Sequence, residues 1–166
     1  MKNLRSKHRT AVGAILALTV ALALASCNRK TIYNHYNHTP MEGWEASDTL
    51  LFVVGSIAET ALYSETIGLR TSSSYPFKEL TLVVNQQIMP AGTLLSDTLR
   101  CRLTDEDGNP LAHGFNFYES AFPLRSISLN PGDSLTVRIH HYMRRELIPG
   151  IADIGVTVQK NIEANQ

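Results

Sequence analysis

The sequence predicts an all-β protein, an antiparallel β-sandwich of about seven to eight short strands. Three observations support this class. After about residue 47, segments in which apolar and polar residues alternate recur along the chain, turn-forming residues separate them, and no amphipathic helical pattern continues for more than about two turns. An immunoglobulin-like, Greek-key or jelly-roll-like arrangement would fit equally well, because sandwich topologies share the same alternation.

The first 26 residues have the composition of a secretory signal peptide. Four basic residues and no acidic residue precede an uncharged, apolar stretch at 11–25. Fifteen helical residues at about 1.5 Å each reach only about 22 Å, short of a hydrocarbon core about 30 Å thick. We therefore predict a cleaved signal (1–26), with an uncleaved N-terminal anchor as the alternative.

The signal ends in LASC (24–27), which matches the bacterial lipobox. The motif needs a thiol to accept a diacylglyceryl group and small neighbours so that the peptidase can approach the backbone. Cys27 is therefore the predicted lipidation site, and its lipid would attach a mature chain of 140 residues to a membrane. Residues 27–47 are polar and unpatterned and are predicted to be a lipidated tether before a β-sandwich domain at 48–166.

Alternation locates the strands of that domain. In TLRCRL (98–103), leucines and Cys101 alternate with arginines, which places the cysteine on the buried face of a strand. The other predicted strands are TLLFVV (49–54), LTLVV (80–84), SLTVRIHHY (134–142) and IGVTVQK (154–160), with weaker patterns at YSETIGLRT (63–71) and LAHGFNF (111–117).

Turn chemistry separates the strands. DEDGNP (105–110) contains Asp-Gly, a strong hairpin signal, and NPGD (130–133) places Pro-Gly at the centre of a predicted type II turn. MRRELIPGIAD (143–153) interrupts the alternation. It is predicted to be a long loop, with room for one helical turn, that ends at Pro149-Gly150.

Charge and cysteine content exclude some classes of protein. All fifteen acidic residues but only eleven of the fifteen Lys and Arg follow Cys27, so the mature chain carries a net charge of about −4. No basic stripe remains for nucleic acid. With Cys27 lipidated, Cys101 has no partner for an internal disulfide and is predicted to be a core residue, with Arg100 and Arg102 on the opposite face.

The six histidines suggest a metal site, but their spacing does not support one. The H-x-x-H at 35–38 lies in the predicted tether, and the adjacent pair at 140–141 points to opposite faces of a strand. The calcium-like start at 105–110 has Pro110 where Gly is required and Asn116 where Glu is required. We predict no metal, and no cofactor other than the covalent lipid.

Catalytic motifs are also missing from the sequence. G-x-S-x-G, a Gly-rich phosphate loop and H-E-x-x-H do not occur. Glu42, Glu45 and Asp48 form no recognisable acid–base pair and are interpreted as a solvated connection. The chain is therefore predicted not to be an enzyme.

Two groups of residues are candidates for binding. Arg144, Arg145, Leu147 and Ile148 combine positive charge with apolar side chains on a loop, and are the predicted partner-binding residues. The alternative is an aromatic ligand site, although most aromatic residues are expected in the core. Its candidates are Trp44, Tyr75, Phe77, Phe115, Phe117 and Tyr118.

The lipobox is followed by a series of specific segments, IYNHY (32–36), YPFKELTLVV (75–84), SDTLRCRLTDEDGNPLAHG (96–114) and HHYMRRELIPGIADIGVTVQK (140–160). Their order and spacing resemble the gliding-motility lipoprotein H (GldH) family of the Bacteroidetes over nearly the whole mature chain. The resemblance implies a role in the envelope machinery of gliding and the associated secretion, and it carries over no catalytic or ligand-binding residues.

The resemblance also implies a location. Surface-exported lipoproteins of that phylum carry acidic residues after the lipidated cysteine, whereas this chain has Asn28, Arg29 and Lys30. We therefore expect an outer-membrane lipoprotein that faces the periplasm and acts as a non-enzymatic accessory or scaffold for envelope protein partners. The alternative is a β-sandwich module that binds glycan or another small ligand.

Overall fold

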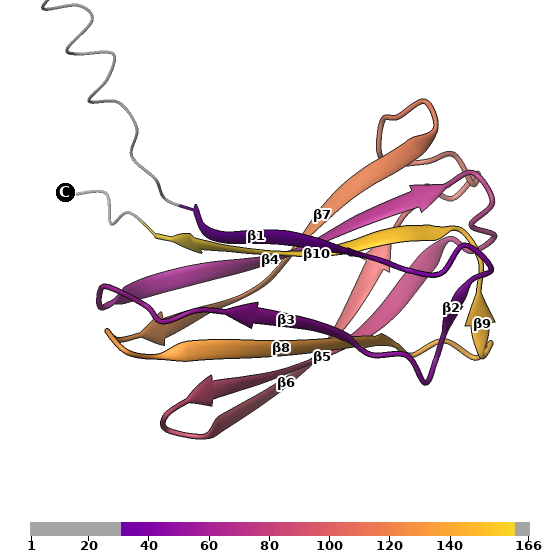
Figure 1. Cartoon of the computed structure of the whole chain (residues 1–166). Coiled ribbons are helices and arrows are strands. Elements are labelled where there is room, and N and C mark those ends of the chain that lie inside the picture. Colours follow the sequence, from indigo (N-terminus) through magenta and orange to yellow (C-terminus); the bar gives the residue numbers. More distant parts are fainter. Residues whose placement is uncertain (1–30, 162–166) are drawn as a thin grey trace, which may run out of the picture. The chain divides into compact units, whose positions relative to one another are not determined.

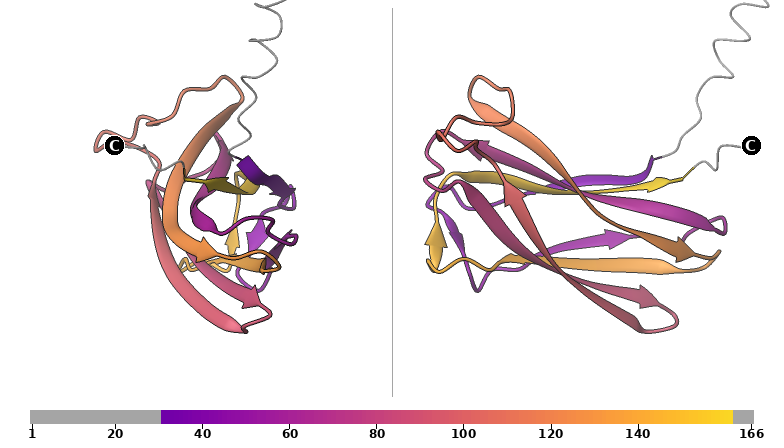
Figure 2. Two further views of the ribbon diagram at one scale, coloured as in Figure 1. Left: turned by 90° about the vertical axis from the view of Figure 1, so that its left-hand side faces the viewer. Right: turned by 180° about the vertical axis from the view of Figure 1, so that it is seen from behind.

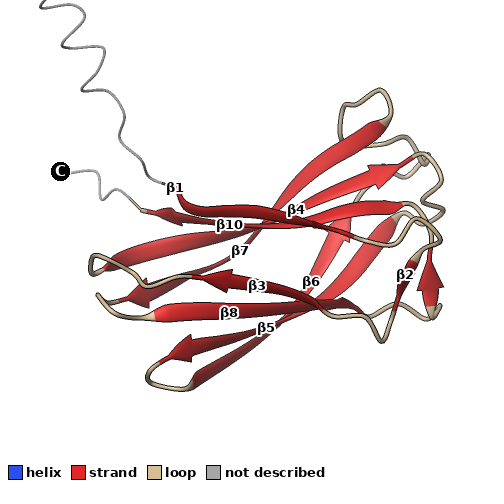
Figure 3. Ribbon diagram, in the orientation of Figure 1, coloured by secondary structure: helices blue, strands red, loops and turns tan. Residues whose placement is uncertain are grey.

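The computed structural model describes residues 31–161, which form ten strands and no helix (Figures 1 and 3). The strands are β1 (Thr31–His38), β2 (Trp44–Glu45), β3 (Leu50–Val54), β4 (Ala61–Ser72), β5 (Glu79–Met89), β6 (Thr93–Arg102), β7 (Phe117–Leu129), β8 (Ser134–His141), β9 (Leu147–Ile148) and β10 (Ile151–Lys160). Nothing in this part of the chain is a helix long and apolar enough to cross a membrane. The predicted signal peptide (1–26) and lipidation site, Cys27, lie outside the described residues.

Two four-stranded antiparallel sheets form a sandwich, which confirms the predicted fold class. One sheet has the order β1-β10-β4-β7 and the other the order β3-β8-β5-β6. The short strands β2 and β9 pair separately. Viewed along the strands, the two large sheets face each other (Figure 2).

Alternate residues of both sheets point inward and form one core. On β8, for example, Leu135, Val137 and Ile139 are fully buried, and the residues between them are not. Each such side chain contributes about 1.5–3 kcal/mol through removal of apolar surface from water. Cys101 is fully buried on β6 beside these leucines and valines, so the predicted core cysteine is confirmed.

The stretch predicted as a tether contains an edge strand. β1 pairs with β10 from Thr31 to His38, and the Tyr36 ring packs against Gly68 and Gly155 on two neighbouring strands. Inward, His35 meets Phe52 of β3 edge-on at 6.4 Å between ring centroids. The sandwich therefore begins at Thr31, and the predicted boundary at residue 48 is too late, because a polar outer face hid this edge strand.

Two further differences concern strands and loops after residue 110. β7, the longest strand, was not predicted, because it contains Pro123 and its alternation shifts at Leu124–Arg125, where a bulge lies. An edge strand tolerates proline, whose missing N–H can face solvent. The weak strand predicted at 111–117 is wrong, since only its last residue is in a strand. The predicted long loop at 143–153 contains β9 and the start of β10.

The predicted turn at 130–133 is present, whereas the predicted hairpin at 105–110 is only a local turn, because β6 and β7 on either side of it belong to different sheets. Asp105 accepts hydrogen bonds from the backbone N and the side-chain Nδ2 of Asn109, at 2.8 and 2.9 Å, and an isolated bridge pairs Thr104 with Pro110. At 130–133, the Asp133 N–H donates to Asn130 O at 3.0 Å. Gly132 there has a φ of 92°.

The interior also contains a polar pair that joins the two sheets. Gln86 Nε2 of β5 donates to Glu65 Oε1 of β4 at 2.8 Å, and both side chains are 2% exposed. Burial raises the pKa of the Glu65 carboxyl, against smaller opposing effects of the Gln86 hydrogen bond and Arg125. Arg125 of β7 in turn pairs with Asp97 of β6 at 2.5 Å, and closes the side of the sandwich between these edge strands.

The two ends of the sandwich differ (Figure 1). One end carries the start of β1, the end of β10 and the turns at 55–60, 90–92 and 130–133; we call it the turn end. The opposite end carries the segments 39–49, 73–78, 103–116 and 142–150; we call it the loop end. All residues proposed from the sequence as partner- or ligand-binding candidates lie at or next to the loop end.

Candidate functional site

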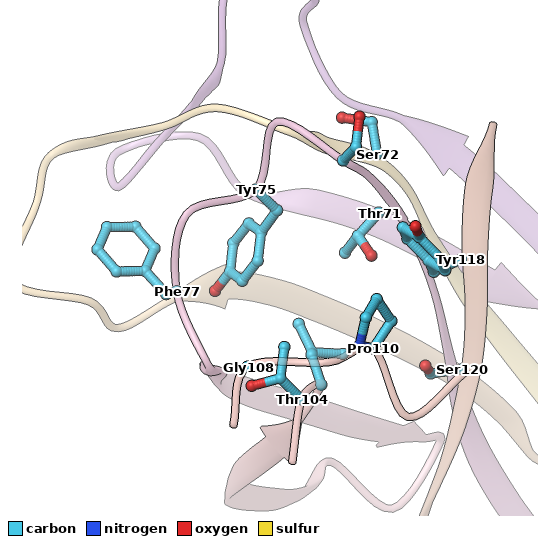
Figure 4. Close-up of a pocket in the computed structure, with 11 residues that line it drawn as sticks. Thr71, Ser72, Tyr75, Phe77, Thr104, Gly108, Pro110, Tyr118 and Ser120 are labelled. Carbon is cyan, nitrogen blue, oxygen red and sulfur yellow. The ribbon is translucent and has the colours of Figure 1, made fainter. Parts of the chain in front are cut away.

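A small cavity opens at the loop end, where the β4–β5 and β6–β7 connections meet (Figure 4). Its volume is about 160 Å³. Figure 4 shows Thr71, Tyr75, Pro110 and Tyr118 around the same space. The remaining lining residues are Ser72, Ser73, Phe77, Leu103, Thr104, Gly108 and Ser120.

The cavity lining combines hydroxyl groups with aromatic rings. Thr71 and Ser120 reach it from β4 and β7 because alternation turns these positions inward at the ends of the strands. The Tyr75 and Phe77 rings meet edge-on at 5.6 Å between centroids. Tyr75 donates its hydroxyl to Glu79 O at 2.8 Å, and burial raises the pKa of this phenol, so it remains a neutral donor.

One hydroxyl in the cavity lining has unused hydrogen-bonding capacity. Thr104 Oγ1 is buried and has no protein partner. A buried polar atom without a partner is destabilising unless water or a ligand satisfies it. A shallower depression next to it is lined by charged residues of both signs, among them Lys78, Glu79, Arg102 and Glu106.

The six aromatic candidates divide into three groups. Tyr75, Phe77 and Tyr118 line the cavity, and Phe115 and Phe117 are exposed on the adjoining segment, at 99% and 52%. Trp44 is fully buried, and its Nε1 donates to Asp48 O at 3.1 Å. Trp44 is therefore a core residue and not part of a binding platform, whereas the structure brings the other five to one end of the molecule.

The predicted partner-binding residues also divide. Arg144, Arg145 and Leu147 are exposed on the connection from β8 to β10. Ile148 is fully buried, because β9 pairs with β2 and turns this side chain toward the core. Ile148 is therefore corrected to a packing residue, and the exposed part of the candidate surface consists of the two arginines and Leu147.

The β2–β9 pair fixes this basic segment to the core. Trp44 pairs with Ile148 and Glu45 with Leu147 in register, and Ala46 N donates to Glu146 O at 2.8 Å. The Trp44 and His141 rings lie 5.3 Å apart between centroids. Burial lowers the pKa of His141, whose Nε2 lies 3.1 Å from Trp44 O, so this histidine is neutral at pH 7.

Titratable groups next to the loop end are mostly paired with one another: His38 Nδ1 lies against Asp153 Oδ1, and Arg70 reaches Asp153 at 3.7 Å and Glu119 at 3.3 Å. Burial raises the pKa of the Cys101 thiol to about 12, which keeps it protonated and unreactive, and Arg100 and Arg102 are exposed on the opposite face. Across residues 31–161, no three His, Cys, Asp or Glu side chains converge as metal ligands. His140 and His141 point to opposite faces of β8, as predicted.

The sequence did not reveal the hydroxyl lining or the interior polar pair. The serine run at 72–74 was the one local signal for the cavity, and serine runs are also common in ordinary loops. Glu65 did carry a signal, since it occupies an inward position between Tyr63 and Ile67 in the alternation of β4. A carboxyl at such a position needs a buried partner.

Comparisons with known proteins identify relatives over most of the chain. The family model described as GldH lipoprotein matches residues 31–158. The gliding motility lipoprotein GldH homolog of Christiangramia forsetii is 23% identical over 162 residues, covering 92% of this chain and 98% of its own length. The gliding motility lipoprotein GldH of Flavobacterium johnsoniae is 24% identical over 152 residues, covering 87% of this chain and 94% of its own.

Similarity to solved structures is weak. An uncharacterised Listeria monocytogenes protein, in complex with glucose, magnesium and calcium, covers 71% of this chain and 9% of its own length at 17% identity and a TM-score of 0.40. The Eiger TNF of S. frugiperda covers 83% of this chain and 98% of its own length, at 13% identity and a TM-score of 0.31. These values support no functional argument.

Proposed function

The chain belongs to the GldH lipoprotein family, and we propose that it acts as a non-enzymatic scaffold in a protein complex of the cell envelope. Its lipid on Cys27 would hold it at the periplasmic face of the outer membrane, and its loop end would contact the protein partners. The observation that carries the proposal is the gathering of exposed arginine and apolar side chains at the end opposite Thr31.

The chain order supports this division of labour. The lipid-bearing Cys27 precedes Thr31, and Thr31 begins β1 at the turn end. β1 has eight residues, which span about 26 Å at about 3.3 Å each, so the loop end lies at least that far along the strand axis. A membrane anchor at one end leaves the other end accessible, and anchoring raises the local concentration of partners held in the same membrane.

The chemistry of the loop end supports a contact surface. Arg144, Arg145 and Leu147 combine a positive charge with apolar area, and Phe115 adds a fully exposed ring. Arginine and aromatic residues are the types most enriched at protein interfaces. His38 Nδ1 lies against Asp153 Oδ1 near this end, and within residues 31–161 no hydroxyl or thiol is hydrogen-bonded to His38.

Crosslinking in the native organism tests the contact surface. We expect the double variant Arg144→Glu, Arg145→Glu to lose crosslinks to its envelope partners, as identified by mass spectrometry. The matched control is Arg100→Glu, Arg138→Glu, which changes the charge equally at exposed positions on the outer face of the second sheet. Equal crosslinking by the two double variants would refute a partner site on the β8–β10 connection.

Two experiments test the anchor and the location. Replacement of Cys27 by Ser should abolish lipid attachment and signal cleavage, which metabolic labelling with a fatty acid and the change in mass would report. If the domain faces the periplasm, protease treatment of intact cells should leave it uncut. Digestion of the domain, with periplasmic markers intact, would instead assign it to the cell surface.

The cavity favours a second candidate function, the binding of a glycan or another small ligand. Aromatic rings beside several hydroxyl groups match the stacking and hydrogen-bonding needs of a sugar ring, and Thr104 Oγ1 lacks a partner. The volume of about 160 Å³ is below the roughly 300 Å³ at which drug-sized sites begin, so the cavity would hold one small ring or side chain.

Calorimetric titration of the purified protein with envelope oligosaccharides tests this second function. Binding that is saturable, lost in Tyr118→Ala and kept in Phe115→Ala would support it, because Tyr118 lines the cavity and Phe115 does not. If no oligosaccharide gives a saturable heat of binding, the ligand-binding function is refuted and the scaffold role remains.

A further inference from the structure

The turn end exposes apolar side chains from five different strands. Leu94 of β6 is 74% exposed and Val53 of β3 is 59% exposed, and the others are exposed by 42–47%. All lie close to the turn end of their strands, and they come from both sheets. This turn-end ring consists of Ile32, Val53, Leu62, Met89 and Leu94.

Register places part of the ring on one row. Val53, Thr136, Gln87 and Leu94 follow one another across β3, β8, β5 and β6, so two apolar residues flank two uncharged ones on the outer face of this sheet. Ile32 and Leu62 lie on the other sheet. The turn-end ring therefore has members on both sheets at this end of the sandwich.

The turns inside the ring carry little free charge. Among residues 55–60, 90–92 and 130–133, the charged residues are Glu59 and Asp133. Glu59 forms an ion pair with Lys160, and Asp133 Oδ2 accepts the Asn130 N–H at 2.8 Å. Glu59 is thus paired with a cation, whereas Asp133 keeps its charge, so the feature that favours approach to a bilayer is the set of exposed apolar side chains.

The short chain between Cys27 and Thr31 limits how far the turn end can lie from the membrane. Cys27 precedes Thr31 by four positions, and an extended chain covers at most about 3.3–3.6 Å per residue, so Thr31 stays within about 14 Å of the lipid-bearing residue. Arg29 and Lys30 fall within this interval, and basic residues beside a membrane surface are attracted to anionic headgroups.

We propose that the turn-end ring docks on the surface of the bilayer that holds the lipid, so that the sandwich stands on the membrane with its loop end directed away. The inference rests on the proposed lipidation of Cys27 and goes beyond it, because an anchor alone would let the domain tumble. The occupant of this surface is the phospholipid headgroup region, which takes up partly exposed apolar side chains without requiring a complementary shape.

Docking can be measured with one fluorophore at two positions of the full-length lipoprotein. Cys101 is buried and Cys27 is lipidated, so an introduced cysteine would be the reactive thiol. Leu94→Cys places a nitrobenzoxadiazole label at the turn end, and Phe115→Cys, at 99% exposure, is the matched control at the loop end. Both proteins are reconstituted in vesicles of phosphatidylethanolamine and phosphatidylglycerol, with and without headgroup-nitroxide lipid.

We expect the nitroxide to quench the label at position 94 several-fold more than the label at position 115, and the emission at 94 to shift to the blue. A third label in Leu62→Cys, on the other sheet, should behave as the label at 94 does. Equal quenching at positions 94 and 115, or shielding of 94 from water without quenching by lipid, would overturn the proposal and assign the ring to a protein contact.

Flotation of the same samples separates this proposal from the anchor. Protein that floats with the vesicles but shows no difference between the two labels would retain the lipid anchor and refute docking. Protein that does not float would refute lipidation at Cys27, and the docking proposal with it.

Discussion

The turn end and the loop end close the same two sheets in different ways. At the turn end, two short turns bond to each other: Ile57 N donates to Asp133 O at 2.7 Å, and Gly132 N donates to Ile57 O at 2.9 Å. The loop end uses four longer segments, a separate strand pair and a buried Trp44. Short turns complete a fold with few residues, whereas the extra chain at the loop end builds a cavity and an exposed surface that closure alone does not require.

The largest loss of stability is expected from removal of the Trp44 side chain, which is buried at the loop end. Trp44→Ala should destabilise the protein by about 3–5 kcal/mol, because it empties a fully buried site and removes the hydrogen bond to Asp48 O. Chemical denaturation of purified protein measures this. A loss below about 1 kcal/mol would show that the β2–β9 corner contributes little to stability.

A pair of glycines compares the two ends directly. Gly132 at the turn end and Gly150 at the loop end both have positive φ, 92° and 81°. A Cβ at Gly132 meets open space, whereas one at Gly150 would lie 2.4 Å from Tyr75 N. Gly132→Ala should therefore destabilise by about 1–2 kcal/mol from backbone strain, and Gly150→Ala by about 1–3 kcal/mol more, because the backbone of 74–75 must shift.

Thermal or denaturant unfolding of both alanine variants makes this comparison. Equal losses of unfolding free energy in the two variants would contradict the tighter packing inferred at the loop end. A larger loss in Gly132→Ala than in Gly150→Ala would show that the turn end is the more tightly packed.

The interior polar pair provides a reference site between the two ends. Glu65 Oε2 and Gln86 Oε1 both lack partners, and a proton on the carboxyl would supply the donor that they need. Because the folded-state pKa of Glu65 is raised, its favourable contribution is complete below the ordinary carboxyl pKa of about 4.3 and is lost as the pH rises through the folded value.

Glu65→Gln mimics the protonated acid at every pH. We expect this variant to be more stable than the parent at pH 7–8 by on the order of 1 kcal/mol, with the difference vanishing below about pH 4. Denaturation curves across this range measure the effect. A variant that is less stable than the parent at pH 8 would show that ionised Glu65 stabilises the folded protein, contrary to its raised pKa.

The smallest effects on stability are expected at the exposed side chains of each end. Phe115→Ser and Leu94→Ser should each change the unfolding free energy by less than about 0.5 kcal/mol, because both side chains are exposed. Their functional effects should differ: Phe115→Ser should weaken crosslinking to partner proteins, and Leu94→Ser should not. Equal loss of crosslinking by both would contradict the assignment of partners to the loop end.

The sequence predicted the strands whose alternation is undisturbed. β5, β6 and β8 contain predicted segments in which the inward residues are apolar and most outward residues are polar. β3, β4 and β10 also contain predicted segments, although β3 is apolar on both faces, with Leu51 and Val53 exposed. The two edge strands of the first sheet were missed for different reasons. β1 is largely polar and depends on β3 and β10 for its inward contacts, and β7 contains Pro123 and a bulge opposite Glu65.

The candidate site was predicted only in part. Exposed arginines on a connection could be recognised from their neighbours, and Arg144 and Arg145 are indeed exposed. The burial of Ile148 and Trp44 could not be recognised from the sequence, because it depends on pairing between residues about a hundred positions apart. The cavity likewise needs the ends of β4 and β7 and two connections in one place, which local patterns do not encode.

The pairing of β1 with β10 sets an order of events in the making of the protein. Gln159 Nε2 donates to Thr31 Oγ1 across 128 positions, so β1 cannot pair with β10 until β10 has been synthesised. Contacts of this sequence separation form late in folding. β1 would therefore stay unpaired until β10 is available, and the first sheet would be completed after the second, whose last strand in the sequence is β8.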